Sequence, residues 1–361
     1  MDRAEPEGKE GKEEEEEAAG DRHLSEMHVR AEDDGSDACA TVFVFVASDR
    51  DEGDVSADSD GTTRCPDDAG RPLVCHDSDG DLVVRRPKRR RRRHTACRAP
   101  SDEGGALRIR HALATPLRDV GLQVWRGALL LADWLLAPRN GAMVRGATIL
   151  DLGAGCGLTA LTAAAAGAQT VFCTDHEATV LANAAANAEG NRRTIGPEAD
   201  VRVRRLHWDG WAALPHVAGA SSTPTTIDDG TDGGCAGDFD WRDADAPALA
   251  RTSLLLAADC CYDDDATDAL LRCVSGLLDR AADGARALFA LERRVCFCVE
   301  GLRARAPAAE HFEAAVRARV ATGEWAAEAL NLADVPQRFE GYDRGSATTL
   351  DLWCVTRGAA E

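Results

Sequence analysis

Three closely spaced glycines are the strongest chemical signal in the sequence. The stretch 148–159 reads Thr-Ile-Leu-Asp-Leu-Gly-Ala-Gly-Cys-Gly-Leu-Thr, so that Gly153, Gly155 and Gly157 follow an apolar run containing Asp151. Glycine adopts positive φ angles and lets a ligand approach the backbone closely. The spacing is G-x-G-x-G, whereas the dinucleotide fingerprint is G-x-G-x-x-G. The pattern predicts a ligand-binding turn between a strand and a helix, and a tight turn without a ligand is the alternative.

An acidic residue follows the next predicted strand. The run 170–174 ends at Asp175, one strand–helix–strand unit after the glycines. In nucleoside-binding sheets a carboxylate at this point accepts hydrogen bonds from the ribose hydroxyls. We therefore predict that Asp175 binds a ribose, and we favour it over Glu177. Trp208, just after a later strand, is placed to contact an adenine ring, and a buried core residue is the alternative.

A second pair of chemically capable residues follows an apolar strand further along. The run 253–258, Ser-Leu-Leu-Leu-Ala-Ala, leads into Asp259, and Tyr262 comes three residues later. Ligands of doubly wound sheets bind beyond the carboxyl ends of the strands, so these two side chains are predicted to face the same ligand. The alternative for Asp259 is the N-cap of a helix beginning near Asp264.

The elements that must position these residues alternate between strands and helices. Strands are predicted at 107–109, 148–152, 170–174, 201–206, 253–258, 286–292, 325–331 and 349–356, and helices at 123–137, 157–166, 177–190, 264–281 and 307–320. Such alternation with Gly-rich turns is typical of an α/β fold with a parallel, doubly wound sheet. The last two strands have no helix between them, which predicts an antiparallel pair at one edge.

Together these features resemble the seven-β-strand protein-lysine methyltransferases of the methyltransferase-like group. The Asp-Leu-Gly-x-Gly-x-Gly motif resembles motif I of the class I methyltransferases, which bind S-adenosylmethionine. Matching segments also occur at 79–87, 114–121, 125–133, 207–208 and 262–269, and the resemblance covers roughly residues 75–356. It implies a class I, Rossmann-like, seven-stranded sheet. It also implies methylation of lysine side chains in a protein, with a nuclear, nucleic-acid-associated substrate.

The resemblance implies roles for individual residues. Asp259 and Tyr262 would hold the target lysine. The predicted cofactor-binding residues are Trp125, Asp151, Gly153, Ala154, Gly155, Gly157, Asp175, Trp208 and Ala258. His207 stands where related sequences often have an acidic residue, so its role stays open.

Methyl transfer to lysine is an in-line displacement by a neutral amine. Free lysine has a pKa of about 10.4, so the site must desolvate the ammonium group and let its proton leave. We predict that Asp259 orients the amine by a hydrogen bond without acting as a base. Tyr262 would wall the lysine channel and contribute cation–π attraction. Alignment of the reacting atoms would supply most of the acceleration, with no metal.

Other functions stay open. The same fold methylates nucleic acids and small molecules, although nucleic-acid amino-methyltransferases carry Asp/Asn-Pro-Pro-Tyr where this chain has Asp259-Cys-Cys-Tyr262. An interaction module that binds the cofactor without turnover is a further alternative. The glycine spacing disfavours an NAD-dependent oxidoreductase.

Composition excludes several classes of protein. The 361 residues include 62 acidic and 42 basic residues, a formal charge of −20, which is not typical of a general nucleic-acid binder. The sequence shows neither the long apolar run of a transmembrane helix nor, in its Glu-rich first residues, a secretory signal. The thirteen cysteines lack C-x-x-C pairs and are expected to be reduced thiols, with Cys260–Cys261 and Cys296–Cys298 filling core space.

The first hundred residues differ from the rest in composition. Residues 1–70 are predicted to be a mostly disordered acidic region, because 1–34 hold 14 acidic and 5 basic residues, with one β-like run at 41–46. Residues 71–104 hold a predicted hairpin and eight basic residues among nine from Arg85 to Arg93. This run predicts an import-receptor signal and a nuclear, and also cytoplasmic, location; direct nucleic-acid contact or a solvated linker is the alternative. The methyltransferase domain is expected over 105–361, with an exposed loop insertion at 212–250.

Overall fold

The chain divides into two units. The first consists of Met1–Ala47 together with Gly104–Glu361, and the second consists of Ser48–Glu103. The computed structural model describes residues 23–24, 38–46, 74–76, 82–84, 104–215, 237–298, 302–339, 342, 344 and 349–358. In the second unit, β3 (Val74–His76) pairs antiparallel with β4 (Leu82–Val84), which confirms the predicted hairpin. The predicted disorder of 1–34 and the basic run from Arg85 to Arg93 fall outside the described residues, apart from His23–Leu24.

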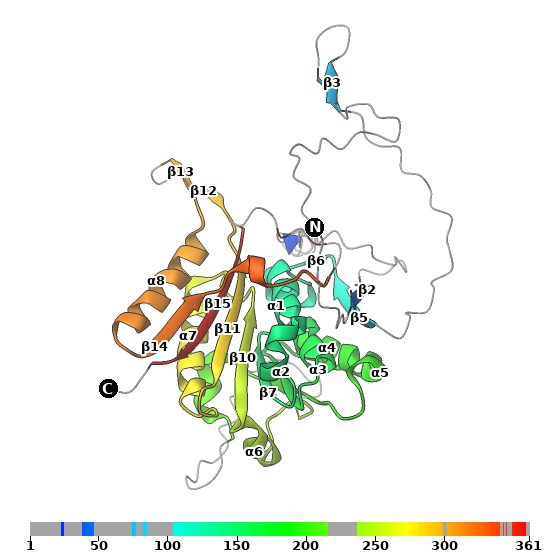
Figure 1. Ribbon diagram of the computed structural model, residues 1–361, viewed down its shortest axis with the longest axis vertical. Coiled ribbons are helices and arrows are strands. Elements are labelled where there is room, and N and C mark those ends of the chain that lie inside the picture. The colour runs from blue at the N-terminus through cyan, green and yellow to red at the C-terminus, as the bar shows by residue number, and fades with distance from the viewer. Residues whose placement is uncertain are drawn as a thin grey trace, which may run out of the picture. The chain divides into compact units, whose positions relative to one another are not determined.

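The first unit is built around a seven-stranded sheet (Figure 1). In spatial order its strands are β14 (Trp325–Ala329), β15 (Leu350–Arg357), β11 (Arg286–Glu292), β10 (Thr252–Ala258), β7 (Thr148–Leu152), β8 (Thr170–Asp175) and β9 (Asp200–Arg205). The last five of these are parallel, and β15 runs antiparallel to both of its neighbours. The predicted doubly wound, seven-stranded class I sheet, with an antiparallel pair at one edge, is confirmed.

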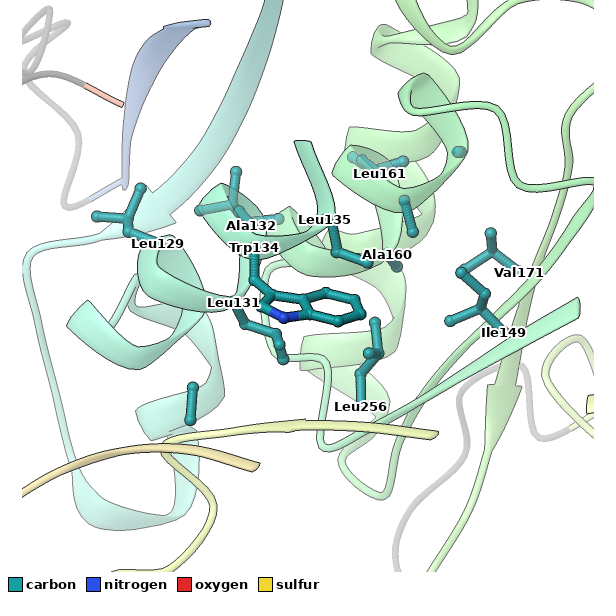
Figure 2. Packing of buried hydrophobic residues seen from close by; sticks show 14 of the residues in the cluster. Leu129, Leu131, Ala132, Trp134, Leu135, Ile149, Ala160, Leu161, Val171 and Leu256 are labelled. Atoms are coloured by element: carbon teal, nitrogen blue, oxygen red, sulfur yellow. The ribbon is translucent and has the colours of Figure 1, made fainter. Parts of the chain in front are cut away.

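Helices pack on both faces of this sheet (Figure 1). One face carries α1 (Arg126–Leu136), α3 (Leu158–Ala165) and α4 (Ala178–Gly190), and the other carries α7 (Asp264–Leu278) and α8 (Pro307–Ala321). Successive side chains of a strand point to opposite faces. Accordingly Ile149 joins the cluster of α1 and α3, whereas Leu150 joins that of α7. In Figure 2 the ring of Trp134, from α1, lies close to Leu131 and to Leu256 of β10.

Shorter elements complete the described part of the chain. They are η1 (Leu117–Leu122), η2 (Pro138–Asn140), α2 (Gly141–Val144), α5 (Arg192–Ile195), η3 (Trp208–Ala213), η4 (Asp243–Asp245), α6 (Ala246–Leu249), β12 (Cys296–Cys298), β13 (Arg303–Arg305) and η5 (Leu332–Asp334). Among the described residues no single helix has both the length and the apolar character to cross a membrane, although the bent pair Leu117–Leu136 and Pro138–Val144 meets both conditions when taken together.

A strand from the acidic N-terminal region is part of the first unit. β2 (Ala38–Val46) pairs antiparallel with β5 (Gly104–Ala112), and β1 (His23–Leu24) pairs with β6 (Ala114–Thr115). Phe43 of β2 is buried, and its ring meets Phe339 edge-on at 6.1 Å between centroids. The predicted β-like run at 41–46 is therefore a strand of the folded unit, although the sequence analysis assigned it to the acidic region.

The predicted loop insertion at 212–250 is only partly an exposed loop. Residues 216–236 lie outside the described residues, but 237–250 include η4 and α6, with Leu249 buried. Asp245 is also buried, and its carboxylate accepts hydrogen bonds from Arg204 Nε at 2.6 Å and Arg202 Nη1 at 3.0 Å. The prediction of an exposed loop was wrong for 237–250, because the ion pairs of Asp245 with Arg202 and Arg204 hold this part of the segment against β9.

The cysteines that the structure describes are free thiols, most of them buried. Cys260 and Cys261 are buried, as predicted. Cys296 is exposed on β12, so the prediction that it fills core space was wrong. Its neighbours in the sequence are apolar, but they belong to a hairpin that extends from the sheet.

Asp133 of α1 binds the segment that precedes β15 through several hydrogen bonds. Its buried carboxylate accepts hydrogen bonds from the backbone N–H groups of Arg338 at 2.7 Å and Phe339 at 3.0 Å. It also accepts from the hydroxyl of Tyr342 and from Arg344 Nη2, the latter at 2.6 Å. One carboxylate thus holds four donors from the chain between η5 and β15.

We expect Asp133→Ala to lower the free energy of unfolding by about 3–5 kcal/mol, because it leaves the partly buried Arg344 and two backbone donors without their acceptor. Urea denaturation would measure this change. The matched control is Asp334→Ala, since Asp334 is half-exposed and lies 3.7 Å from Arg139. Loss of this surface pair is expected to change stability by at most about 1 kcal/mol. Equal losses in the two variants would contradict the anchoring role.

Candidate functional site

A pocket lies where the strand order reverses, at the carboxyl ends of β7 and β10. Nine of the eleven predicted site residues line it: Trp125, Gly153, Ala154, Gly155, Asp175, Trp208, Ala258, Asp259 and Tyr262. Asp151 and Gly157 do not line it. Ligands of doubly wound sheets bind at this kind of switch point, so the arrangement fits the predicted ligand site.

The glycine loop between β7 and α3 depends on positive φ angles. Gly153, Gly155 and Gly157 have φ of 67°, 55° and 81°. A Cβ atom on Gly153 would come within 2.8 Å of Cys260 Sγ and 3.1 Å of Trp208 Cζ2. Glycine is therefore required at 153 both by the turn and by the two side chains that pack on it.

The segment before α1 forms the wall opposite the glycine loop. It contains η1, and the carbonyl oxygen of Gly121 would lie 2.8 Å from a Cβ atom on Gly155. Cys156 Sγ donates a hydrogen bond to the same oxygen at 3.4 Å. Trp125 closes this wall, and its Nε1 donates to the carbonyl oxygen of Val120 at 3.0 Å.

Asp175 stands at the end of β8 with its carboxylate facing the glycine loop. Oδ2 accepts a hydrogen bond from Gly155 N–H at 3.1 Å, and Oδ1 accepts one from His176 N–H at 2.8 Å. The hydrogen bond to Asp175 raises the pKa of His176, a residue that also lines the pocket. Glu177, the less favoured candidate, is the N-cap residue of α4 and does not line the pocket.

The adjacent residues His207 and Trp208 differ in exposure and in their relation to the pocket. Trp208 begins η3, is partly buried, and both lines the pocket and packs on the cluster of α7, so its contact with an adenine ring stays a prediction. His207 is exposed, lies outside the pocket lining, and its ring meets that of His176 edge-on at 5.8 Å between centroids.

Asp259 is the most constrained residue of the site. It is buried with a φ of 54°, in the left-handed region that, apart from glycine, aspartate and asparagine adopt most readily. Oδ2 accepts from Gly127 N–H at 2.5 Å and Oδ1 from Glu292 N–H at 2.7 Å, so the carboxylate joins the start of α1 to the end of β11. Burial raises its pKa. The N-cap of α7 is Asp263, so the N-cap alternative for Asp259 was wrong.

Tyr262 lies at the mouth of the pocket, with 41% of its surface exposed. Burial of the remainder raises its pKa to about 12. Its hydroxyl therefore stays protonated at neutral pH and does not act there as a base. The ring is available as a wall for an aliphatic side chain that enters the pocket.

Two arginines lie next to these residues. Arg126 Nη1 pairs with Glu292 Oε1 at 2.7 Å, and both side chains are largely buried. The guanidinium carbon of Arg294 lies 4.7 Å from the centroid of the Trp125 ring. The positive charge of Arg294 acts against the burial that raises the pKa of Asp259.

A further set of pocket residues was not predicted from the sequence. They are Arg118, Val120, Gly121, Gln123, Val124, Ala128, Cys156, Leu158, Thr159, His176, Val180 and Cys260. The segment 114–121, which we used only for the family resemblance, was the available signal for the first three. In the described part of the chain, His, Cys, Asp and Glu side chains form no group of three that could hold a metal ion.

Asp151 lies beneath the pocket instead of in it. It is fully buried in β7 and accepts a hydrogen bond from the hydroxyl of Thr159, which lines the pocket. Burial raises its pKa from 3.8 to about 7. Gly157 likewise faces inward, where a Cβ atom would lie 3.5 Å from Cys173 Sγ. Both residues support the glycine loop from behind.

The raised pKa of Asp151 predicts a pH-dependent stability. The folded state disfavours the ionised carboxyl, so its contribution to stability is complete below about pH 4 and is lost as the pH rises through about 7. Between these limits the loss approaches about 1.4 kcal/mol per pH unit. We expect the free energy of unfolding to fall less steeply from pH 5 to 7 in Asp151→Asn than in the unmodified chain, measured by urea denaturation. The control Asp334→Asn should keep the full slope, and equal slopes in all three would contradict the assignment.

Comparison with known proteins agrees with this geometry. Residues 103–216 match the model of the family described as lysine methyltransferase. Methyltransferase-like protein 22 of Mus musculus is 34% identical over 267 residues, 66% of this chain and 62% of that protein. The protein of the same name in Homo sapiens is 34% identical over 268 residues, 67% of this chain and 61% of that protein. The chain thus spans less than two thirds of the length of these relatives.

A third relative matches a shorter part of this chain. The electron transfer flavoprotein beta subunit lysine methyltransferase of Homo sapiens is 34% identical over 87 residues, 24% of this chain and 32% of that protein. The resemblance recognised in the sequence is confirmed, since residues 103–216 match the lysine methyltransferase family and both relatives at 34% identity over more than 260 residues carry the name of a methyltransferase-like protein.

Proposed function

We propose that this chain transfers methyl groups from S-adenosylmethionine to lysine side chains of a protein. The observation that carries the proposal is one pocket in which the glycine loop, Asp175 and Trp208 lie beside Asp259 and Tyr262. The first group of residues suits a nucleoside and the second suits an amine. The family match supports lysine as the acceptor.

The residues present fit S-adenosylmethionine. The buried carboxylate of Asp175 ends β8 beside the backbone of Gly155, where it can accept hydrogen bonds from two ribose hydroxyls. The ring of Trp208, packed against Gly153, offers an apolar surface for the adenine. When bound, the cofactor supplies a methyl group activated by a positively charged sulfur. Trp125, on the opposite wall, would enclose it.

The acceptor side must hold a neutral amine in line with that methyl group. Each oxygen of Asp259 already accepts one backbone N–H and retains one lone pair for a further donor. Asp259 therefore orients the amine from a position fixed by two elements. Tyr262 confines the aliphatic part of the lysine, and its protonated hydroxyl leaves proton removal to solvent. Positioning thus supplies most of the acceleration.

Two alternative reactions are less well supported. The Asp259-Cys-Cys-Tyr262 turn lacks the two prolines of the nucleic-acid amino-methyltransferases. A small-molecule acceptor would need no surface beyond the pocket. The name of the third relative refers to a lysine of a protein subunit, which favours a protein acceptor by analogy.

We also propose that the chain acts in the nucleus. The support is the run of eight basic residues among nine from Arg85 to Arg93, which suits an import receptor. A nuclear, nucleic-acid-associated protein is the proposed substrate class. Replacing these arginines by glutamine should move a fluorescently tagged chain from the nucleus to the cytoplasm, and an unchanged distribution would contradict this proposal.

Radiolabelled S-adenosylmethionine would test the reaction. The purified chain is incubated with nuclear extract, and the products are treated with protease or with nuclease. We expect label in a protease-sensitive band that is absent with Tyr262→Ala. Label in nuclease-sensitive material would move the proposal to nucleic acid, and cofactor binding without any transfer would indicate a module without turnover.

A further inference from the structure

The target lysine must lose a proton before it can accept a methyl group, and the side chains at the acceptor side of the pocket are poor bases. Tyr262, with its pKa raised to about 12, is already protonated at neutral pH. Burial raises the pKa values of the Cys260 and Cys261 thiols, the latter to about 12, so both stay neutral as well. The carboxylate of Asp259 attracts the ammonium form of an amine and so opposes the loss of its proton. A positive charge beside this carboxylate would offset that attraction.

Arg294 is held against the pocket wall by an aromatic ring. It follows the end of β11 by two residues, and its guanidinium carbon lies 4.7 Å from the centroid of the Trp125 ring. Trp125 lines the pocket, and its Nε1 donates a hydrogen bond to the carbonyl oxygen of Val120 at 3.0 Å. Cation–π attraction to this fixed ring therefore keeps the guanidinium at the wall, although the Arg294 side chain is exposed.

The charge of Arg294 acts on three groups at the acceptor side of the pocket. Burial raises the pKa of Asp259, and Arg294 is the strongest of the influences that oppose this rise, ahead of Arg126. Burial also raises the pKa values of Glu292 and Tyr262, and Arg294 opposes both rises. Its action on all three groups indicates that the guanidinium lies near each of them. A proton held by any group at this place is therefore disfavoured by the fixed charge.

The other charges around the acceptor side are paired or exposed to water. Arg126 Nη1 is bound to Glu292 Oε1 at 2.7 Å. The carboxylate of Asp175 accepts hydrogen bonds from the backbone N–H groups of Gly155 at 3.1 Å and His176 at 2.8 Å. Three acidic residues before and at the start of α7 are exposed, so water and salt screen their charges: Asp263, Asp264 and Asp265. This leaves the guanidinium above the indole ring as the charge that most opposes a proton at this side of the pocket.

We propose that Arg294 is a positioning residue of the acceptor site, whose fixed positive charge beside Asp259 promotes loss of the ammonium proton of the bound lysine to solvent. The proposal rests on the proposed function, because it concerns the lysine of that reaction. Once the proton has left, the lone pair of the nitrogen forms the bond to the methyl carbon, and the carbon–sulfur bond breaks with its electron pair on sulfur. Arginine suits this role because it stays charged throughout the physiological pH range.

Kinetics with a small acceptor test the proposal. The acceptor is Nα-acetyl-lysine amide, and kcat and KM are measured for the full chain with S-adenosylmethionine between about pH 6 and pH 10. Arg294→Gln removes the charge, and Arg294→Lys retains it. The matched control is Arg280→Gln, because Arg280 lies over the ring of Trp211 at the same 4.7 Å. Arg280 follows the end of α7 and Tyr262 precedes its start, so a helix about 22 Å long separates the control from the acceptor site.

At neutral pH we expect Arg294→Gln to lower kcat about tenfold and also to lower KM for the acceptor, because the ammonium form then binds without repulsion. The pH at which kcat levels off should rise by about one pH unit, so that kcat approaches that of the unmodified chain at higher pH. Arg294→Lys and the control should keep both values within about threefold. A role in structure alone predicts a higher KM, since a loosened pocket binds the acceptor less well. A raised KM, or a kcat that falls equally at every pH, would overturn the proposal.

Titration of Asp259 provides a readout that needs no turnover. The aspartate carboxyl carbons of the full chain are isotopically labelled for NMR, and the signal of Asp259 is assigned by its absence in Asp259→Asn. We expect its titration midpoint to move to higher pH in Arg294→Gln and to stay in place in Arg294→Lys and in the control Arg280→Gln. An unchanged midpoint in Arg294→Gln would overturn the proposal. The expected change in midpoint, with no methyl transfer to the acceptor at any pH, would contradict the proposed function alone.

Discussion

Gly155→Ala is expected to weaken S-adenosylmethionine binding about hundredfold, or about 2.7 kcal/mol. Gly155 has a φ of 55°, which an L side chain adopts only with strain. Its Cβ atom would also lie 2.8 Å from the carbonyl oxygen of Gly121. That oxygen is part of the backbone and accepts a hydrogen bond from Cys156, so it cannot move alone. Alanine must therefore push the glycine loop away from the opposite wall.

Gly146→Ala is the matched control for backbone strain. Gly146 has a φ of 71°, but a Cβ atom there would meet no heavy atom within 4 Å, and the residue precedes β7 at the end remote from the pocket. Alanine at 146 should lower stability by about 1 kcal/mol and leave cofactor affinity unchanged. Isothermal titration calorimetry and thermal unfolding would measure both quantities. Unchanged affinity in Gly155→Ala would show that the two walls do not need this close approach.

The sheet and most of the site were predictable because their signals are local. Buried parallel strands are short apolar runs, and β7, β10 and β11 lie within one residue of their predicted ends. The residues that follow such strands converge at one edge of the sheet, which is why Asp175 and Asp259 could be placed together from spacing alone. The direction of each side chain was not predictable in this way. Asp151 belongs to the motif but points into the interior.

The remaining parts depend on contacts between distant segments. Gly121 and Arg118 reach the pocket because the segment before α1 lies across the glycine loop, and no periodic pattern in 114–125 indicates this. The sequence also did not indicate that Asp259 joins α1 to β11, because its partners are backbone N–H groups at positions 127 and 292. The exposed hairpin was missed because each of its strands has only three residues.

Asp259→Ala is expected to lower turnover about thousandfold, which corresponds to about 4 kcal/mol in the barrier. The structure adds a second effect, because two backbone N–H groups would lose their acceptor and the start of α1 would separate from β11. Each such loss costs about 1–3 kcal/mol of stability. The measurement must therefore include unfolding and cofactor affinity besides turnover. We expect a lower unfolding temperature with cofactor affinity within about threefold, since the glycine loop and Asp175 are untouched.

Substitutions of Tyr262 distinguish an effect on turnover from an effect on stability at the same site. Because 41% of its surface is exposed, Tyr262→Ala should leave the unfolding temperature nearly unchanged while turnover falls about hundredfold through loss of alignment. Tyr262→Phe keeps the ring that walls the channel and should retain turnover within about threefold, because the hydroxyl, with its pKa raised to about 12, takes no proton. If Asp259→Ala lost turnover only by loosening α1, its cofactor affinity would fall as much as its turnover. A loss of turnover shared with Tyr262→Ala, with affinity retained in both, would instead place both side chains on the acceptor amine.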